Sequence, residues 1–206
     1  MGLSAPPPPR SQALLELAPR EPVPLEVQHV VNRFYSGQAA VDRWLHHQAG
    51  PAQLNNRART WVCISEGQVM GYYSLRLGEV FPLADGFRHL SPKRPEPRPI
   101  PVLLLHRLGV DVQRRGCRWA RAMLRHAIYA AHSVTPLMAL EALVAAAPWP
   151  HAQAFYQRYG FQPSGLAPHL WALPLGPRSP ITGLLWGRGR GRGTDPSPSP
   201  SPSQGL

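Results

Sequence analysis

The apolar residues of this chain follow two periods, and the clearest example of each lies in its second half. Residues 102–110 are apolar enough to predict a central strand. After a short Arg- and Gly-rich turn, apolar residues recur in pairs every four positions, which predicts one buried stripe along a helix. The stripe consists of Trp119, Ala120, Met123, Leu124, Ala127, Ile128 and Ala131. The pattern therefore predicts a strand that leads into a long amphipathic helix.

The first half of the chain predicts a strand, a helix and a β-hairpin. Residues 25–31 alternate loosely between polar and apolar and predict a first strand. Apolar residues at helical spacing follow over 38–49 and predict a helix. Two β-rich runs, 59–65 and 68–80, flank a short acidic-Gly turn, so they predict a hairpin.

The remaining elements complete an α/β architecture. Short strands are expected at 137–144 and 169–175, with a helix at 149–159 between them. Pro150 suits the start of this helix and Gly160 its end. A hairpin combined with a crossover helix indicates a mixed sheet with helices on its faces.

Proline-rich segments delimit the folded region. Residues 1–24 contain seven prolines, and residues 177–206 are mostly Pro, Gly, Ser and Arg. Neither end can bury enough apolar surface to offset the entropy of ordering it, so both are predicted to be disordered around one domain at 25–176. Within that domain, residues 81–101 hold six prolines and predict a stiff, extended loop. The tail also alternates Arg with Gly, which fits either a nucleic-acid-binding repeat or a solvated cationic tail.

The chain is strongly basic, with a formal net charge of +11. The predicted domain alone holds 16 basic and 8 acidic side chains, so the tails do not account for the whole excess. A basic folded domain favours a polyanionic partner, either nucleic acid or a phosphate-rich cofactor.

Several classes of protein are disfavoured by the sequence. Two cysteines, Cys63 and Cys117, are too few for a disulfide framework. The chain shows no signal peptide and no apolar run of about 18 residues, so a cytoplasmic location without a membrane partner is expected. The nine histidines do not show metal-ligand spacing, so no metal is expected.

The turn between the central strand and the long helix carries the candidate chemistry. It reads QRRGCRWA over 113–120, and the unpaired amides of a helix N-terminus can bind phosphate groups. Taken alone, such a turn equally fits an ordinary capped helix. Downstream, the cluster FYQRYGF at 155–161 offers tyrosines that could protonate a leaving group.

Five segments of the predicted domain follow a known order and spacing. They are FYSGQAAVDRWLHHQA from 34, RTWVCISEGQVMGYYSL from 59, IPVLLLHRLGVD from 100, QRRGCRWARAMLRHA from 113 and AQAFYQRYGF from 152. Together they resemble the GNAT superfamily of acetyl-CoA-dependent N-acetyltransferases. Within it they are most similar to toxins of type II toxin–antitoxin modules, which acetylate the α-amine of aminoacyl-tRNA. The resemblance implies a mixed, mostly antiparallel sheet of six to seven strands flanked by about four helices.

The resemblance also implies a role for each site residue. The backbone of Leu108, Gly109 and Val110 would bind the pantetheine arm of acetyl-CoA, the co-substrate. The pyrophosphate would be held by Arg115, Gly116, Cys117, Arg118, Trp119 and Ala120. Tyr156 would donate a proton to the departing CoA thiolate, and no metal is implied.

The implied partners are an aminoacyl-tRNA substrate, a ribbon–helix–helix antitoxin and a possible second copy of the chain. The amine of an aminoacyl ester is less basic than a free α-amino group of pKa about 8, so no strong base is required. Such an enzyme would work mainly by positioning the amine and the thioester. Candidate contacts to tRNA phosphates are Arg88, Lys93, Arg94, Arg98, Arg107 and Arg114, each of which could equally be a solvated surface charge.

The sequence departs from the family pattern in two places. Arg118 occupies the middle glycine of Q/R-x-x-G-x-G/A, where its side chain would either block the pyrophosphate or contact it. The segment AAAPWPHA at 145–152 lacks the acidic residues that are common there. One alternative is therefore a GNAT-shaped, non-catalytic binding protein with a damaged pyrophosphate loop. Another is an acetyltransferase for a small amine or a protein.

Some site residues also have a structural interpretation. Tyr156 could be a core aromatic, and Tyr159, about a turn away, is the rival proton donor. Trp119 is expected to pack within the helix and to meet a ligand through its amide. Cys117 has no histidine at a recognisable spacing, so it is expected to be incidental.

Overall fold

The computed structural model describes residues 19–82, 84–90, 98–116, 118–176 and 179. Most of both proline-rich ends, the Arg/Gly repeat and Cys117 lie outside these residues. The domain boundaries at 24 and 177 therefore stay predictions.

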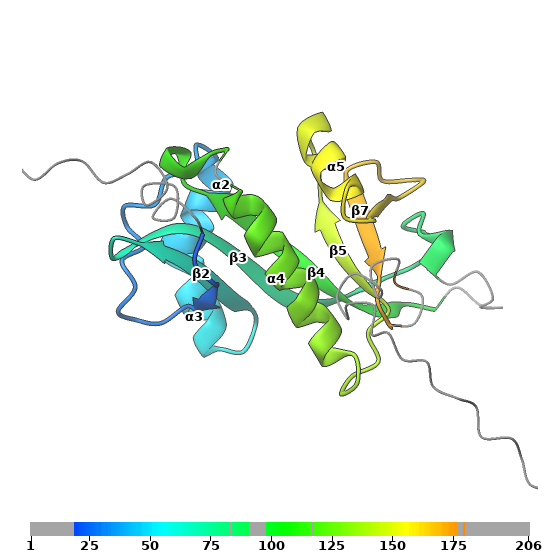
Figure 1. Ribbon diagram of the computed structural model, residues 1–206. Coiled ribbons are helices and arrows are strands. Elements are labelled where there is room, and N and C mark those ends of the chain that lie inside the picture. Colours follow the sequence, from blue (N-terminus) through cyan, green and yellow to red (C-terminus); the bar gives the residue numbers. More distant parts are fainter. Residues whose placement is uncertain (1–18, 83, 91–97, 117, 177–178, 180–206) are drawn as a thin grey trace, which may run out of the picture.

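A seven-stranded sheet organises the described part of the chain (Figure 1). Its strands are β1 (Val23–Pro24), β2 (Arg59–Ser65), β3 (Gln68–Val80), β4 (Ile100–Val110), β5 (Ala142–Ala146), β6 (Gln162–Pro163) and β7 (Leu170–Pro174). Their spatial order is β1-β2-β3-β4-β5-β7-β6. Neighbours pair antiparallel except β4 and β5, which are parallel. The predicted mixed, mostly antiparallel sheet is confirmed.

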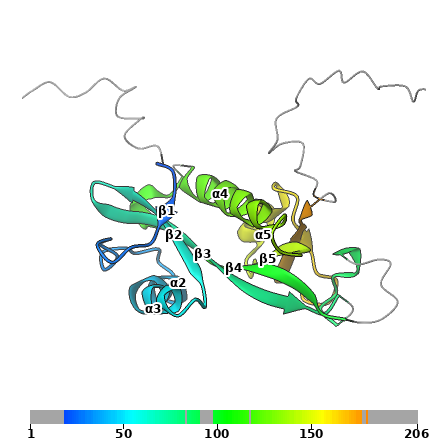
Figure 2. The ribbon, with the colours of Figure 1, turned by 90° about the horizontal axis from the view of Figure 1, so that it is seen from below.

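Four α-helices within the described ranges flank this sheet. They are α2 (Ala39–Arg43), α3 (Ala49–Leu54), α4 (Trp119–Val134) and α5 (Pro150–Gln157). Figure 2 shows α4 on one face of the sheet and α2 with α3 on the other. A π-helical stretch, Trp44–Gln48, joins α2 to α3. Pro51 accounts for this irregularity, because proline has no N–H to donate to the carbonyl four residues earlier.

The apolar stripe of α4 packs on the sheet and forms the main core. Its buried residues are Trp119, Met123, Leu124, Ala127, Ile128 and Ala131, whereas Ala120 is only half-buried. They contact buried residues of β3, β4 and β5, such as Tyr73, Leu105 and Leu143. Burying one Leu or Ile side chain contributes about 1.5–3 kcal/mol, so this stripe fixes α4 against the sheet.

A second core lies between α2 and the opposite face of the sheet. It contains Phe34, Val41, Leu45 and Tyr72, all of them buried. A Cβ atom at Gly109 would lie 2.5 Å from Cγ1 of Val41. The absence of a side chain at Gly109 therefore allows α2 to pack directly on the end of β4.

The predicted strand at 25–31 does not form. Only Val23–Pro24 pairs along β2, with a further single bridge between Val30 and Gln68. In between, the His29 amide donates to the Glu26 carbonyl and closes a turn. Val27 is 97% exposed, so the alternation of this segment does not reflect one buried face.

Two other boundaries differ from the sequence prediction. The predicted strand at 137–144 begins only at Ala142, because the amides of Leu137 and Met138 donate to the Val134 carbonyl at the end of α4. The loop predicted at 81–101 ends two residues early, since β4 begins at Ile100. The two-residue strand β6 has no periodic signal and was not predicted.

Candidate active site

A cavity of about 610 Å³ opens beside the end of β4 and α5. Six of the ten candidate site residues line it: Leu108, Gly109, Val110, Arg115, Ala120 and Tyr156. The other lining residues are Ser36, Gln38, Val41, Ala146, Pro148, Trp149, His151, Ala152, Ala154, Phe155 and Arg158. The fold thus brings the strand end, the turn before α4 and the tyrosine of α5 to one place.

The cavity exists because β4 and β5 diverge. They pair only from Val102 with Ala142 to Leu105 with Ala145, and no other described strand pairs with that edge of β4 beyond this point. A bulge lies at the same place, where His106 is an extra residue opposite β3. The β5-facing edge of β4 can therefore pair with the amide groups of a ligand, as an added strand would.

The turn before α4 keeps the backbone conformation of a glycine at position 118. Arg118 has φ +63° and ψ +5°, in the left-handed region. This conformation costs a non-glycine residue about 1–2 kcal/mol. The Arg118 side chain is exposed and is not among the residues that line the cavity.

The N-terminus of α4 follows directly after this turn. Its N-cap residue, Arg118, makes no side-chain capping hydrogen bond, and Gly116, with φ +75°, is exposed ahead of it. Trp119 is only 1% exposed, so its ring belongs to the core and only its backbone borders the turn. Amides at a helix start attract anions, so the position of this turn suits a phosphate group.

Arg115 is held against the loop that precedes α2. Its guanidinium donates a hydrogen bond to the Ser36 carbonyl. A Cβ atom on Gly37 would lie 2.9 Å from Nη2 of Arg115, and Gly37 has φ +78°. The left-handed backbone conformation therefore favours glycine at 37, and a side chain there would also displace the guanidinium of Arg115.

Two buried carboxylates that the sequence analysis did not single out fix this side of the cavity. Asp42 accepts hydrogen bonds from the amide of Ser36 at 2.8 Å and from its hydroxyl at 2.6 Å. Asp111 accepts from the amides of Tyr35 at 2.8 Å and Gln113 at 2.9 Å. Their positions, in the first turn of a helix and directly after a strand, were the available sequence signal.

Tyr156 reaches the cavity from α5 and is 7% exposed. Its ring packs against Phe155 and Phe161, with ring centroids 5.5 Å and 5.1 Å away. Burial raises the pKa of the Tyr156 phenol well above its ordinary value, so the group is protonated at neutral pH. Tyr159, the rival tyrosine, does not line the cavity.

Comparison with known proteins now adds to this geometry. Residues 56–163 match the acetyltransferase (GNAT) domain family. The chain is also 32% identical over 144 residues to the "tRNA-acetylating toxin" of Mycobacterium tuberculosis (strain ATCC 25618 / H37Rv), which covers 69% of this chain and 85% of the relative. The chain belongs to the GNAT acetyltransferase family.

Solved structures share the fold of this GNAT acetyltransferase. The toxin AtaT complexed with acetyl-methionyl-tRNAfMet aligns with a TM-score of 0.65 and 24% identity over 72% of this chain and 89% of that one. The AtaTR complex bound with acetyl-CoA aligns with a TM-score of 0.61 and 23% identity over 74% and 91% of the two chains. At this level of identity the structures establish the fold alone.

The acetyltransferase cavity also contains residues that sequence reasoning had not assigned. Trp149, His151 and Arg158 line it from α5 and its flanks. No aspartate or glutamate is among its described lining residues. The sequence pointed to this part of the cavity only through the absence of acidic residues in the segment before α5.

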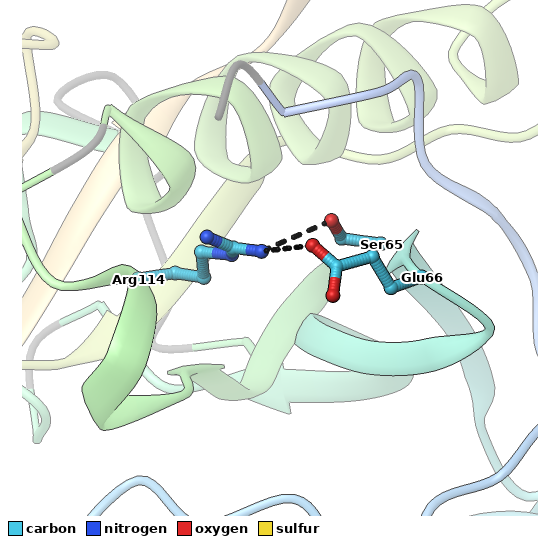
Figure 3. Close-up of polar contacts among 3 residues, drawn as sticks. All are labelled: Ser65, Glu66 and Arg114. Carbon is cyan, nitrogen blue, oxygen red and sulfur yellow. Dashed lines mark hydrogen bonds and ion pairs between the residues drawn. The ribbon is translucent and has the colours of Figure 1, made fainter. Parts of the chain in front are cut away.

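Arg114, one candidate contact for tRNA phosphates, makes polar contacts within the protein. Its Nη2 atom lies 3.2 Å from both Oε1 of Glu66 and Oγ of Ser65 (Figure 3). Its side chain is only 12% exposed, so it ties the end of β4 to the hairpin turn. Among the other candidates, Arg98 is exposed, whereas Lys93, Arg94 and the side chain of Arg88 lie outside the described part.

The bulge of β4 presents two further basic residues. The Arg107 guanidinium lies over the Trp44 ring at 6.0 Å and donates to the His106 carbonyl. Burial, helped by the charges of Arg107 and Arg76, lowers the pKa of His106 to about 4. His106 is therefore neutral at physiological pH, while Arg107 is a partly buried cation.

Other expected features concern metals, membranes and cysteines. In the ranges given above, no three His, Cys, Asp or Glu side chains gather to hold a metal ion. The described helices are too short or too polar to cross a membrane. Cys63 is buried, and burial raises the pKa of its thiol to about 12, which keeps it protonated and unreactive.

Proposed function

We propose that this GNAT enzyme transfers the acetyl group of acetyl-CoA to the α-amine of aminoacyl-tRNA, and that it acts in the cytoplasm as a toxin that blocks translation. The observation that carries the proposal is one cavity shared by the open edge of β4, the turn before α4 and Tyr156. The choice of acceptor is supported by the tRNA-acetylating activity in the name of the 32%-identical relative.

The cavity suits acetyl-CoA in size and in chemistry. Its volume of about 610 Å³ lies within the usual range of ligand sites. The uncapped start of α4 and the guanidinium of Arg115 would hold the diphosphate. Leu108, Gly109 and Val110 would hold the pantetheine amides along the open edge of β4. When bound, acetyl-CoA supplies the acetyl group as a thioester.

Tyr156 is the proposed general acid. Its raised pKa keeps the phenol protonated, so it can donate a proton to the departing thiolate. Its described neighbours are mainly apolar, including Phe155 and Phe161, and these contacts hold the Tyr156 ring in the cavity wall.

The acceptor fits an amine that is bound in its neutral form. The amine of an aminoacyl ester is less basic than a free α-amino group, so a large part of it is neutral at cytoplasmic pH. No carboxylate among the described lining residues would hold an ammonium ion. The net charge of +11 favours a polyanion such as tRNA as the carrier of this amine.

The geometry favours catalysis over the alternative of non-catalytic binding. That alternative depended on Arg118 blocking the pyrophosphate loop, and the Arg118 side chain is exposed outside the cavity. An exposed guanidinium beside an uncapped helix start adds positive charge to the phosphate site instead.

We also propose an antitoxin partner of the ribbon–helix–helix class. The structural neighbour AtaT has been solved bound to the C-terminus of its antitoxin AtaR, which supports a toxin–antitoxin pair here. A homodimer stays a prediction of the family resemblance.

The test is transfer of labelled acetyl from acetyl-CoA to matched acceptors. Charged tRNA should be labelled on its amino acid, which alkali then releases as an N-acetyl amino acid. Deacylated tRNA and a free amino acid ester are the controls and should receive little label. Equal labelling of the free ester would favour the small-amine alternative, and no labelling of any acceptor would refute the proposal.

A further inference from the structure

Trp149 is a large aromatic residue without an evident structural role. It lines the cavity directly before α5 and is 54% exposed. Among the described residues, no hydrogen bond to its indole N–H and no stacked aromatic ring is found. Trp149 as a whole residue therefore buries less than half of its surface in the protein.

Trp149 occupies a helix position at which tryptophan is unfavourable for the helix itself. It is the N-cap residue of α5, with φ −116° and ψ 145°, and Pro150 follows at the first helical position. Ser, Thr, Asp or Asn at an N-cap accepts a hydrogen bond from the first helical amides and stabilises the helix. No side chain caps α5 here. Tryptophan thus gives up helix stability at this position and places a partly exposed aromatic residue at the cavity wall.

The charge around Trp149 indicates the kind of ligand that would meet this ring. The cavity is lined by the cationic side chains of Arg115 and Arg158, and by no described acidic residue. Cationic side chains beside an exposed aromatic ring form the combination that binds nucleotides, because the cations attract phosphates while the ring stacks on the base.

We propose that Trp149 stacks on an adenine ring of a nucleotide bound in this cavity. The inference rests on the proposed function, since both proposed ligands carry an adenosine next to phosphate: coenzyme A has one, and so does the 3′ end of tRNA. Trp149 contributes affinity for that ligand, whereas Tyr156 handles the proton.

Two variants distinguish the effect of losing the aromatic ring from the effect of any substitution at position 149. Trp149→Ser removes the ring and supplies an N-cap, so the helix is not weakened, whereas Trp149→Phe keeps a smaller ring. Tyr129→Ser is the matched control, because Tyr129 is 61% exposed on α4 and does not line the cavity. Calorimetric Kd values are measured for coenzyme A, for phosphopantetheine, which lacks the adenosine, and for charged tRNA.

Trp149→Ser should lower the affinity for one of the two adenosine-containing ligands by about 5- to 150-fold, as expected for the loss of one base–aromatic stack. Trp149→Phe should lose less, and Tyr129→Ser should match the wild type. Weaker binding of coenzyme A with unchanged phosphopantetheine identifies the adenine of the donor. Weaker binding of tRNA alone identifies its terminal adenosine. The ligand should also quench tryptophan fluorescence in the wild type more than in Trp149→Phe.

The inference is overturned if the wild type binds both ligands and the Kd values of Trp149→Ser stay within twofold of the wild-type values. The proposed function survives that outcome. A wild type that binds neither coenzyme A nor charged tRNA instead refutes the proposed function, and the inference with it.

Discussion

Tyr156 and Tyr159 are three residues apart, and their spacing alone does not say which one could act. The structure separates them, because Tyr156 is 7% exposed in the cavity wall and Tyr159 does not line the cavity. The chemistry of the site thus depends on which face of a short helix meets the end of β4.

Tyr156→Phe should leave the fold intact and slow acetyl transfer by about 100-fold or more, the usual range for the loss of a general acid. Tyr159→Phe is the matched control and should retain near-normal turnover. Steady-state kcat, with circular dichroism as the check on folding, measures the effect. Near-normal kcat in Tyr156→Phe would remove the assigned role.

The pH profile gives a second readout of the same residue. Burial raises the pKa of Tyr156 above its ordinary value of about 10, so the phenol stays protonated as pH rises to about 9. Deprotonation of the acceptor amine increases over the same range. The wild-type rate should therefore rise and not fall between about pH 6 and 9.

The backbone conformation at position 118 favours glycine, but the residue there is arginine. In its left-handed conformation Arg118→Gly should stabilise the protein by about 1 kcal/mol. Arg121→Gly, at an exposed position inside α4, should destabilise it by about 1 kcal/mol. Urea unfolding of both variants measures the difference, and a loss of stability in Arg118→Gly would contradict the assigned strain.

At the scale of elements, the packing of α2 on β4 depends on a single glycine. A Cβ atom at Gly109 would meet Cγ1 of Val41 at 2.5 Å, and carbon atoms of Tyr72 and Phe34 at 3.1 Å and 3.2 Å. These groups are buried and cannot easily move aside. The approach of α2 therefore shapes one wall of the cavity.

Gly109→Ala should lower the free energy of unfolding by about 1–3 kcal/mol, the usual cost of overpacking a core. Gly50→Ala in α3 is the control, because its new Cβ would lie in open space. Alanine also favours a helix more than glycine, so this change should not lower the free energy of unfolding. Equal costs in the two variants would contradict the proposed packing constraint.

The elements also show what sequence patterns can and cannot determine. The hairpin was predicted at the residue ranges of β2 and β3, because two β-rich runs flanked a turn. The divergence of β4 from β5 was not predicted, since it depends on pairing register and on a bulge at His106 that leave no periodic signal. The wall contributed by Trp149 was not predicted either, because it depends on how α5 meets the end of β4 and the turn before α4, which are distant in the sequence.

At the scale of the whole molecule, the charge balance connects the fold to its substrate. The chain carries 22 basic and 11 acidic side chains. Arg114 is paired with Glu66, so part of this charge is structural. The remaining excess creates a field that attracts polyanions over a long range.

Affinity for charged tRNA should therefore fall steeply as salt rises, because binding releases counterions from the phosphates. Between about 50 and 200 mM salt we expect a loss of at least about tenfold, measured by filter binding. Phosphopantetheine, with a single phosphate, is the control and should change much less. A flat response for tRNA would favour a small amine or a protein as the acceptor.

The central claim is that the cavity between the end of β4 and α5 binds acetyl-CoA, and titration calorimetry tests it most directly. The account predicts saturable binding of one acetyl-CoA per chain. Ala120→Trp, which fills the turn side of the cavity, should abolish binding, whereas Arg121→Trp on the exposed face of α4 should not. An absence of binding to the wild type, or equal binding to Ala120→Trp, would contradict the account.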